Sequence, residues 1–288
     1  MALAGAPSVH ERAVAALERL PPFSPILNSL IASLTDENVS FAKIAELIEK
    51  DTVLSGNILK LVNSALFGLP GTVHSIRHAV SLLGLDKLRN ASMIMTVARM
   101  WKIKTPPGWS IARFNLHSVG VAILSDLLAH RLDVPSKEGA FAAGLFHDLG
   151  LLMLAVGLPE EYQQIALLQQ QNPGSIADHE LQVLGTTHAE LSADALGIWS
   201  LPEPIQVAVR YHADPGLDPT RISKGQVTLS RIVNCADQHV REQGICVKLF
   251  EDSTEGDGNP LDILGLDENL PIVLSEFESQ FSSVQPYF

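Results

Sequence analysis

Residues 140–158 have the sequence AFAAGLFHDLGLLMLAVGL and form the longest apolar stretch of this 288-residue chain. A membrane span would have to hide His147 and Asp148, which lie in the middle of the stretch, and burying such groups in lipid is costly. A helix in the core of a soluble protein explains the stretch better, because such a helix is apolar all round. We therefore expect a buried helix with a polar pair at its centre.

Imidazole and carboxylate groups recur in apolar helical surroundings elsewhere in the chain. They are His117, His188, His212 and Asp237. Such groups are metal ligands, and burying them without partners is costly. Adjacent helical residues such as His147 and Asp148 diverge by about 100°, but one ion against that arc can take a ligand atom from each. Together these residues predict a metal centre, either active or reduced to a remnant.

Each of these residues also has an ordinary explanation. The histidine–aspartate pair can cap a helix or satisfy itself inside a core, and a lone histidine on an apolar stripe, such as His117, is usually a hydrogen-bonded core residue. His188 and His212 lie near helix ends, where capping or exposure is common. Asp237 has Arg241 one helical turn away as an ion-pair partner. The metal hypothesis rests on the whole set, because each member falls where a helix would face a shared cleft.

The composition is that of a folded, acidic protein. Hydrophobic residues make up 46% of the chain, which argues against disorder, and the formal net charge of -12 argues against broad binding of nucleic acid. Cys235 and Cys246 are too few for a disulfide framework and form no CxxC pair, so a reducing compartment is the simpler interpretation. Residues 1–20 lack the apolar core of a signal peptide. We expect a cytoplasmic protein without a membrane span.

Helical periodicity between clear stops dominates the chain, and strand signals are few. Asp51, Ser75 and Thr187 have the positions of helix N-caps, and Thr187 has capping-box spacing to Glu190. The Pro-Pro-Gly break at 106–108 is the candidate internal boundary. These patterns predict an all-α, two-lobed protein with a helical lobe at 1–105, a second helical core at 106–250 and an acidic loop with a tail at 251–288.

Short motifs in the second half resemble the HD superfamily of metal-dependent phosphohydrolases. They are FNLHS at 114–118, GLFHDLG at 144–150, LGTTH at 184–188 and YH at 211–212. Motifs in the first half resemble the HDOD family, the signalling-associated branch of that superfamily. These are LPP at 20–22, DTVL at 51–54, NSALFG at 63–68, SI at 75–76 and AVSLLG at 79–84. The resemblance covers roughly residues 18–242.

The resemblance implies an all-helical fold and a role in bacterial signalling, where HDOD domains often occur beside receiver or cyclic-di-GMP domains. Many members have lost the metal ligands and are thought to act through protein contacts. This chain matches the superfamily's first histidine, HD pair and final aspartate with His117, His147, Asp148 and Asp237. His188 and His212 match the histidines that bind a second metal in dinuclear members. Mixed ligands of this kind suit one or two ions of Fe, Mn, Ni or Zn.

Several departures from active HD-GYP members count against hydrolysis of cyclic di-GMP. Those members have a lysine four residues after the HD histidine, whereas this chain has Leu151 and lacks that cation for the developing phosphate charge. Their glutamate four residues before the first histidine is replaced by Arg113. The second residue of their His-His pair is Ala213, and DPGL at 214–217 replaces the Gly-Tyr-Pro signature. The sequence therefore assigns no catalytic residue.

The leading hypothesis is a cytoplasmic signal-transduction module that binds protein partners and retains a structural or regulatory metal site. The alternative is a metal-dependent phosphohydrolase with a mono- or dinuclear centre, acting on a nucleotide or another phosphoester. A third interpretation is a module that binds a small nucleotide without turnover. An open coordination position at the metal favours the enzyme. A closed site with a large apolar patch on the N-terminal lobe favours the binding module.

Overall fold

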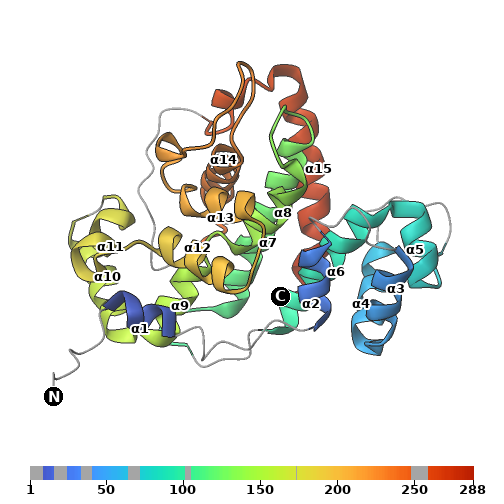
Figure 1. Ribbon diagram of the computed structural model, residues 1–288, viewed down its shortest axis with the longest axis horizontal. Helices are drawn as coiled ribbons and strands as arrows, with labels where there is room; N and C mark the ends of the chain where they lie inside the picture. Colours follow the sequence, from blue (N-terminus) through green and yellow to red (C-terminus); the bar gives the residue numbers. More distant parts are fainter. Residues whose placement is uncertain are drawn as a thin grey trace.

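The computed structural model describes residues 9–15, 25–33, 41–63, 72–100, 105–172, 174–247 and 259–288. Within these ranges the protein consists of α-helices and short 3₁₀ helices without a β-strand, which confirms the predicted all-α fold (Figure 1). Three predicted features lie outside the described residues: the Pro21-Pro22 helix stop, most of the NSALFG motif and nearly all of the acidic loop.

A first group of five helices, α2 to α6, comes from residues 25–100. They are α2 (Pro25–Ala32), α3 (Phe41–Glu49), α4 (Thr52–Val62), α5 (Ile76–Leu83) and α6 (Leu85–Met100). The predicted caps are present, because Asp51 and Ser75 each accept a hydrogen bond from the backbone N–H three residues ahead. Asn63 joins the end of α4 to the next segment by exchanging two hydrogen bonds with the backbone of Val73. The first residue of the NSALFG motif therefore has a structural role.

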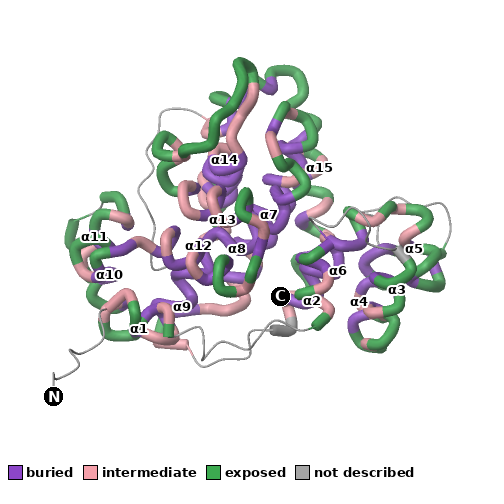
Figure 2. Tube along the Cα trace, viewed as in Figure 1, coloured by how far each residue is buried: buried purple, intermediate pink, exposed green. Residues whose placement is uncertain are grey.

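The second group builds the larger core. It comprises α7 (Ile111–Ala129), α8 (Ala140–Phe146), α9 (Leu149–Gly157), α10 (Pro159–Gln171), α11 (Ile176–Leu184), α12 (His188–Ile198), α13 (Glu203–Arg210), α14 (Leu229–Glu242) and α15 (Leu270–Val284). Helix α7 contacts α8, α14 and α15, and buried residues concentrate along α7, α8 and α14 (Figure 2). A Cβ on Gly144 would lie 2.8 Å from the Cα of Ala122, so α8 approaches α7 backbone to backbone.

The most N-terminal described helix, α1 (Val9–Ala15), packs against α9 and α12 and so lies with the second group (Figure 1). Its Arg12 forms an ion pair with Glu161 of α10. The predicted division of the chain at residue 105 remains a prediction, and a cut there would separate α1 from the helices that it contacts.

Two segments are long and apolar enough to cross a membrane, namely α7 and the stretch 137–157. Their most apolar windows are 72% and 94% buried inside the protein. Both segments therefore form the core of this fold, as we expected for residues 140–158.

The apolar stretch 140–158 is not one continuous helix. It is divided into α8 and α9 at the polar pair, where Asp148 has φ −97° and ψ 13° and the N–H of Leu151 bonds to its carbonyl oxygen. A continuous helix would turn the side chains of His147 and Asp148 about 100° apart. The break instead brings the two side chains together, with His147 Nε2 3.3 Å from Asp148 Oδ2.

Candidate metal centre

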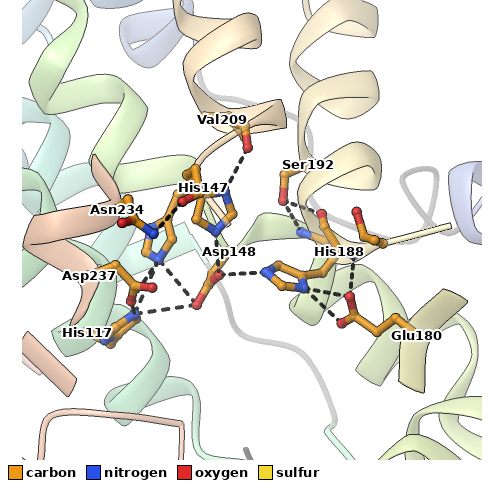
Figure 3. A network of polar contacts seen from close by, with 12 residues as sticks. His117, His147, Asp148, Glu180, His188, Ser192, Val209, Asn234 and Asp237 are labelled. Carbon is orange, nitrogen blue, oxygen red and sulfur yellow. Dashed lines mark hydrogen bonds and ion pairs between the residues drawn. The ribbon is translucent and has the colours of Figure 1, made fainter. Parts of the chain in front are cut away.

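The six residues predicted as metal ligands come together at the centre of the second helical group. Figure 3 labels all of them except His212. All are buried, with exposed fractions between 0% and 6%. His117 comes from α7 and Asp237 from α14, whereas His188 is the first residue of α12 and His212 follows the end of α13. Thr187 forms the predicted capping box with Glu190, which fixes the start of α12. Four helices, α7, α12, α13 and α14, thus gather the other four residues around the HD pair.

The six side chains form two sets that share Asp148. In the first set, Nε2 of His117 lies 3.4 Å from Asp148 Oδ2 and 3.1 Å from Asp237 Oδ1. Nε2 of His147 lies 3.3 Å and 3.5 Å from the same two oxygens. In the second set, Nε2 of His188 lies 3.5 Å and Nε2 of His212 lies 3.7 Å from Asp148 Oδ1. Each carboxylate oxygen of Asp148 therefore faces a different set of imidazoles.

The other ring nitrogen of every histidine in the cluster is held by an acceptor. Nδ1–H of His117, His147 and His212 donates to the carbonyl oxygens of Ile245, Gly144 and Val209, at 2.7–2.8 Å. Nδ1–H of His188 donates to the carboxylate of Glu180 at 2.7 Å. Because a carbonyl or carboxylate only accepts, these bonds hold a proton on Nδ1, so Nε2 is the atom that gives its lone pair to a metal once it has lost any proton of its own. All four imidazoles are thus oriented as metal ligands.

Glu180 is a site residue that the sequence reasoning missed. Its side chain is fully buried on α11 and accepts hydrogen bonds from both Nδ1 and the backbone N–H of His188. A signal was present, because Glu180 lies midway between Ile176 and Leu184 on the buried face of one helix. A carboxylate at an apolar position needs a partner, and here the partner is a candidate metal ligand eight residues further along the chain.

We expect Glu180→Gln to weaken binding of one of two metal ions by roughly ten- to hundredfold, the usual effect of losing a carboxylate that orients a ligating histidine. Glutamine can still accept the bond from Nδ1, but it removes the negative charge that increases the basicity of His188. Metal titration of the variant should therefore show one unchanged and one weakened site. Glu190→Gln is the matched control, because the Glu190 carboxylate caps the same helix through Thr186 and Thr187, whereas the ring of His188 bonds to Glu180, and equal weakening in both variants would contradict the assigned role.

The charges in the cluster are strongly coupled. Burial lowers the pKa of His147, but the charges of Asp148 and Asp237 more than offset this and raise it to about 10. Burial likewise raises the pKa of Asp148, while His147 and His117 hold it well below its usual range. Burial and the neighbouring imidazoles lower the pKa of His212. The carboxylates are therefore ionised, and a metal ion has to displace protons from the imidazoles when it binds.

Unsatisfied polar atoms test whether a metal fits this site. Oδ1 of Asp148 and Nε2 of His188 are buried and have no hydrogen-bond partner within the described ranges. Nε2 of His117 and Nε2 of His147 lie 3.3 Å apart, so either a proton or a metal ion has to lie between the two nitrogen atoms. A divalent cation in each set would satisfy these atoms. The residues present therefore fit a dinuclear centre with mixed imidazole and carboxylate ligands.

A cleft of about 800 Å³ opens onto one side of the cluster. His188, His212 and Asp237 line it together with Tyr211 and Arg241. The volume is within the range of small-molecule binding sites, roughly 300–1,000 Å³. The candidate metal site is therefore open toward a space that can hold a ligand.

Arg241 is the ion-pair partner that the sequence proposed as the ordinary explanation of Asp237. Its Nε–H donates to Asp237 Oδ1 at 2.8 Å, and its Nη2 lies 3.8 Å from Asp148 Oδ2. The ion pair occurs within the cluster and does not replace it, because the same Asp237 oxygen also faces His117 and His147. Asn234, another residue of α14, donates a hydrogen bond to the carbonyl oxygen of His212 and fixes the segment after α13.

Solved structures of similar fold extend over the whole chain. A protein of unknown function with an HDOD domain, from Geobacter sulfurreducens, superposes with a TM-score of 0.77 at 24% identity, over 98% of this chain and 99% of that one. A protein from Shewanella amazonensis, provisionally named a phosphohydrolase, gives 0.73 at 22% identity, over 96% and 97%. A protein from Marinobacter aquaeolei, provisionally named a signal transduction protein, gives 0.68 at 23% identity, over 96% and 64%. At these identities the likeness shows the fold alone.

Curated relatives are longer than this chain. An uncharacterized protein from Treponema pallidum is 27% identical over 202 residues, which are 68% of this chain and 38% of the relative. The uncharacterized protein YuxH from Bacillus subtilis is 27% identical over 124 residues, which are 43% of this chain and 30% of YuxH. The chain thus spans about a third of the length of the curated relatives that it matches.

The profile of the HDOD domain matches residues 20–215, which is more than half of the chain. This range includes the helices α2 to α6 and all of the candidate ligands except Asp237. The chain therefore belongs to the HDOD domain family.

Proposed function

We propose that this HDOD protein holds two divalent metal ions and hydrolyses a phosphoester bound in the adjoining cleft. The observation that supports this most is the orientation of the four imidazoles, whose Nε2 atoms all face the carboxylates while Nδ1 is bonded elsewhere. A buried polar cluster with only a structural role has no need for this shared orientation. The name of the Shewanella relative agrees with the proposal but adds no observation on this chain.

Each side chain has a definite task in the proposed reaction. His117, His147 and Asp237 would hold one ion, His188 with His212 would hold the other, and Asp148 would contribute a carboxylate oxygen to each. When bound, the ions lower the pKa of a water nucleophile and polarise the phosphoryl oxygens. The protein orients the imidazoles through their Nδ1 bonds, excludes bulk water from the buried cluster and admits the phosphoester from the open side. A substrate that fills the cleft is the size of a nucleotide rather than of free phosphate.

Metal content and hydrolysis of bis(p-nitrophenyl) phosphate test this function. Protein purified without chelator, or loaded with Mn or Fe, is expected to bind two ions per chain and to release p-nitrophenolate. Treatment with EDTA should abolish the release and re-addition of metal should restore it. Protein that takes up no metal after loading with either ion would contradict the proposal.

A metal-regulated binding module is the second candidate, and Leu151 favours it. This side chain is 3% exposed beside the cluster and brings no cation to the site. In that case the ions would hold the helices in a form that binds a signalling partner, in agreement with the name of the Marinobacter relative. Two bound ions without hydrolysis of mono- or diester substrates would favour this candidate over the enzyme.

A further inference from the structure

The side chain of Arg241 lies directly beside both carboxylates of the proposed centre. It is 17% exposed, bonds through Nε–H to Asp237 and places Nη2 3.8 Å from Asp148. A guanidinium has five N–H donors and no lone pair for a metal, so Arg241 cannot itself be a ligand. Its ion pair with Asp237 is the ordinary structural role, although His117 and His147 lie near the same carboxylate oxygen.

Arg241 lines two hollows at once. One is a small gap beside His117, Asp148 and His188, and the other is the cleft of about 800 Å³ that reaches His212 and Asp237. The guanidinium therefore lies at the border between the ligand cluster and the cleft. An anion that approaches Asp148 from the cleft comes within reach of it.

Helix α9 contributes no positive charge to the small gap. Leu151 lines it on that side, and within the described ranges Arg241 is its sole lysine or arginine. The positive charge that α9 lacks at Leu151 thus comes from Arg241 of α14. The absence of a lysine at position 151 argued against catalysis. The gap nevertheless has a permanent positive charge, because Arg241 lines it.

We infer that Arg241 binds the non-bridging oxygens of the phosphoryl group of the substrate, a role that rests on the proposed phosphohydrolase function. Guanidinium groups bind phosphate through two parallel, charge-assisted hydrogen bonds, and this geometry needs a fixed fork. The bond from Nε to Asp237 fixes the fork at the border of the cleft. Arg241 thus binds and orients the phosphoryl group at the border between the ligand cluster and the cleft.

A purely structural role makes an opposite prediction for metal binding. If Arg241 only neutralised Asp148 and Asp237 to keep the site folded, its removal would damage the site and lower metal uptake. If it binds the substrate, its removal takes away a positive charge that repels metal ions. Metal uptake should then remain intact or increase, while binding of an anion weakens.

Inorganic phosphate, titrated calorimetrically into manganese-loaded protein, tests the inference, with manganese per chain measured on the same samples. Arg241→Ala is expected to retain the manganese of the wild type and to bind phosphate about ten- to hundredfold more weakly, because a charge-assisted hydrogen-bonded pair is lost. Arg241→Lys keeps the charge without the fork and should recover part of the affinity. Arg231→Ala is the matched control, because Arg231 lies on α14 but outside the lining of the cleft.

The outcomes separate this inference from the function on which it rests. Unchanged phosphate affinity in Arg241→Ala with full manganese content overturns the inference and leaves the proposed function standing. Loss of manganese and phosphate together in both Arg241 variants shows a structural role and also overturns it. Wild-type protein that binds no manganese contradicts the proposed function itself, and the inference with it.

Discussion

Asp148→Asn is expected to remove both metal ions, with bound metal falling from two per chain to background and the affinity of each site dropping more than a hundredfold. Asp148 is the one described carboxylate that belongs to both ligand sets, with Oδ2 facing His117 and His147 and Oδ1 facing His188 and His212. Asparagine has a similar shape but lacks the charge and offers a single oxygen. Even the loss of a group that only orients a ligand usually costs ten- to hundredfold in affinity, so the loss of a bridging ligand should cost more.

Variants that change a ligand of only one set show how much metal is lost when a single site is damaged. Asp237→Asn should weaken one ion and His212→Gln the other, so each is expected to retain about one ion per chain. Asp126→Asn is the control, because Asp126 is a partly buried carboxylate of α7 in neither ligand set. Mass spectrometry of bound metal gives the stoichiometry. A variant Asp148→Asn with two ions per chain would contradict a shared ligand.

Thermal or denaturant unfolding gives a second measurement of the same effect. A metal that binds only the folded protein stabilises it by about 2.7 kcal/mol at a free concentration of 100 times Kd. Wild-type protein should therefore unfold at a higher temperature or denaturant concentration with metal than with EDTA. Asp148→Asn should unfold at the same point in both conditions, which distinguishes a lost site from a metal bound elsewhere.

The candidate site could be predicted from the sequence because its side chains interrupt apolar helical patterns. His147 and Asp148 inside the apolar stretch 140–158 are costly unless a partner lies inside the fold, and the partners turned out to be the other four candidates. The starts of three helices could also be predicted, since Asp51, Ser75 and Thr187 act as the predicted caps. Both kinds of signal are local, because a cap or a buried polar group is recognisable within a few residues.

The remaining features depend on contacts between helices that no local pattern encodes. The stretch 140–158 is divided into α8 and α9 at the HD pair, so a single-helix prediction for it was wrong. Glu180 becomes meaningful only when α11 lies beside the first residue of α12. Arg241 was considered as a partner of Asp237, but its position at the border of the cleft required the fold. Cytoplasmic localisation and signalling partners stay predictions.

Gly150→Ala is expected to destabilise the protein by about 3 kcal/mol or more, the upper part of the usual range for overpacking a core. A Cβ at this position would lie 2.1 Å from the carbonyl oxygen of His188 and under 3 Å from two more of its backbone atoms. Backbone atoms cannot rotate away as a side chain can, so α9 and α12 would have to separate. The N–H of Gly150 also bonds to Ser192, which bonds in turn to the same carbonyl oxygen.

The separation should weaken the metal centre as well as the fold. His188 is the residue against which Gly150 packs, and its Nε2 lies 3.5 Å from Asp148 Oδ1, so a shift of α12 moves a ligand of the second set. Urea unfolding in EDTA measures the loss of stability alone, and metal titration then measures the weakened second ion. Gly56→Ala is the control, because Gly56 is an exposed residue of α4 with nothing within 4 Å of an added Cβ, and the variant should gain about 0.5–1 kcal/mol of stability. A Gly150→Ala protein with wild-type stability and two tightly bound ions would show that α9 and α12 do not pack this closely.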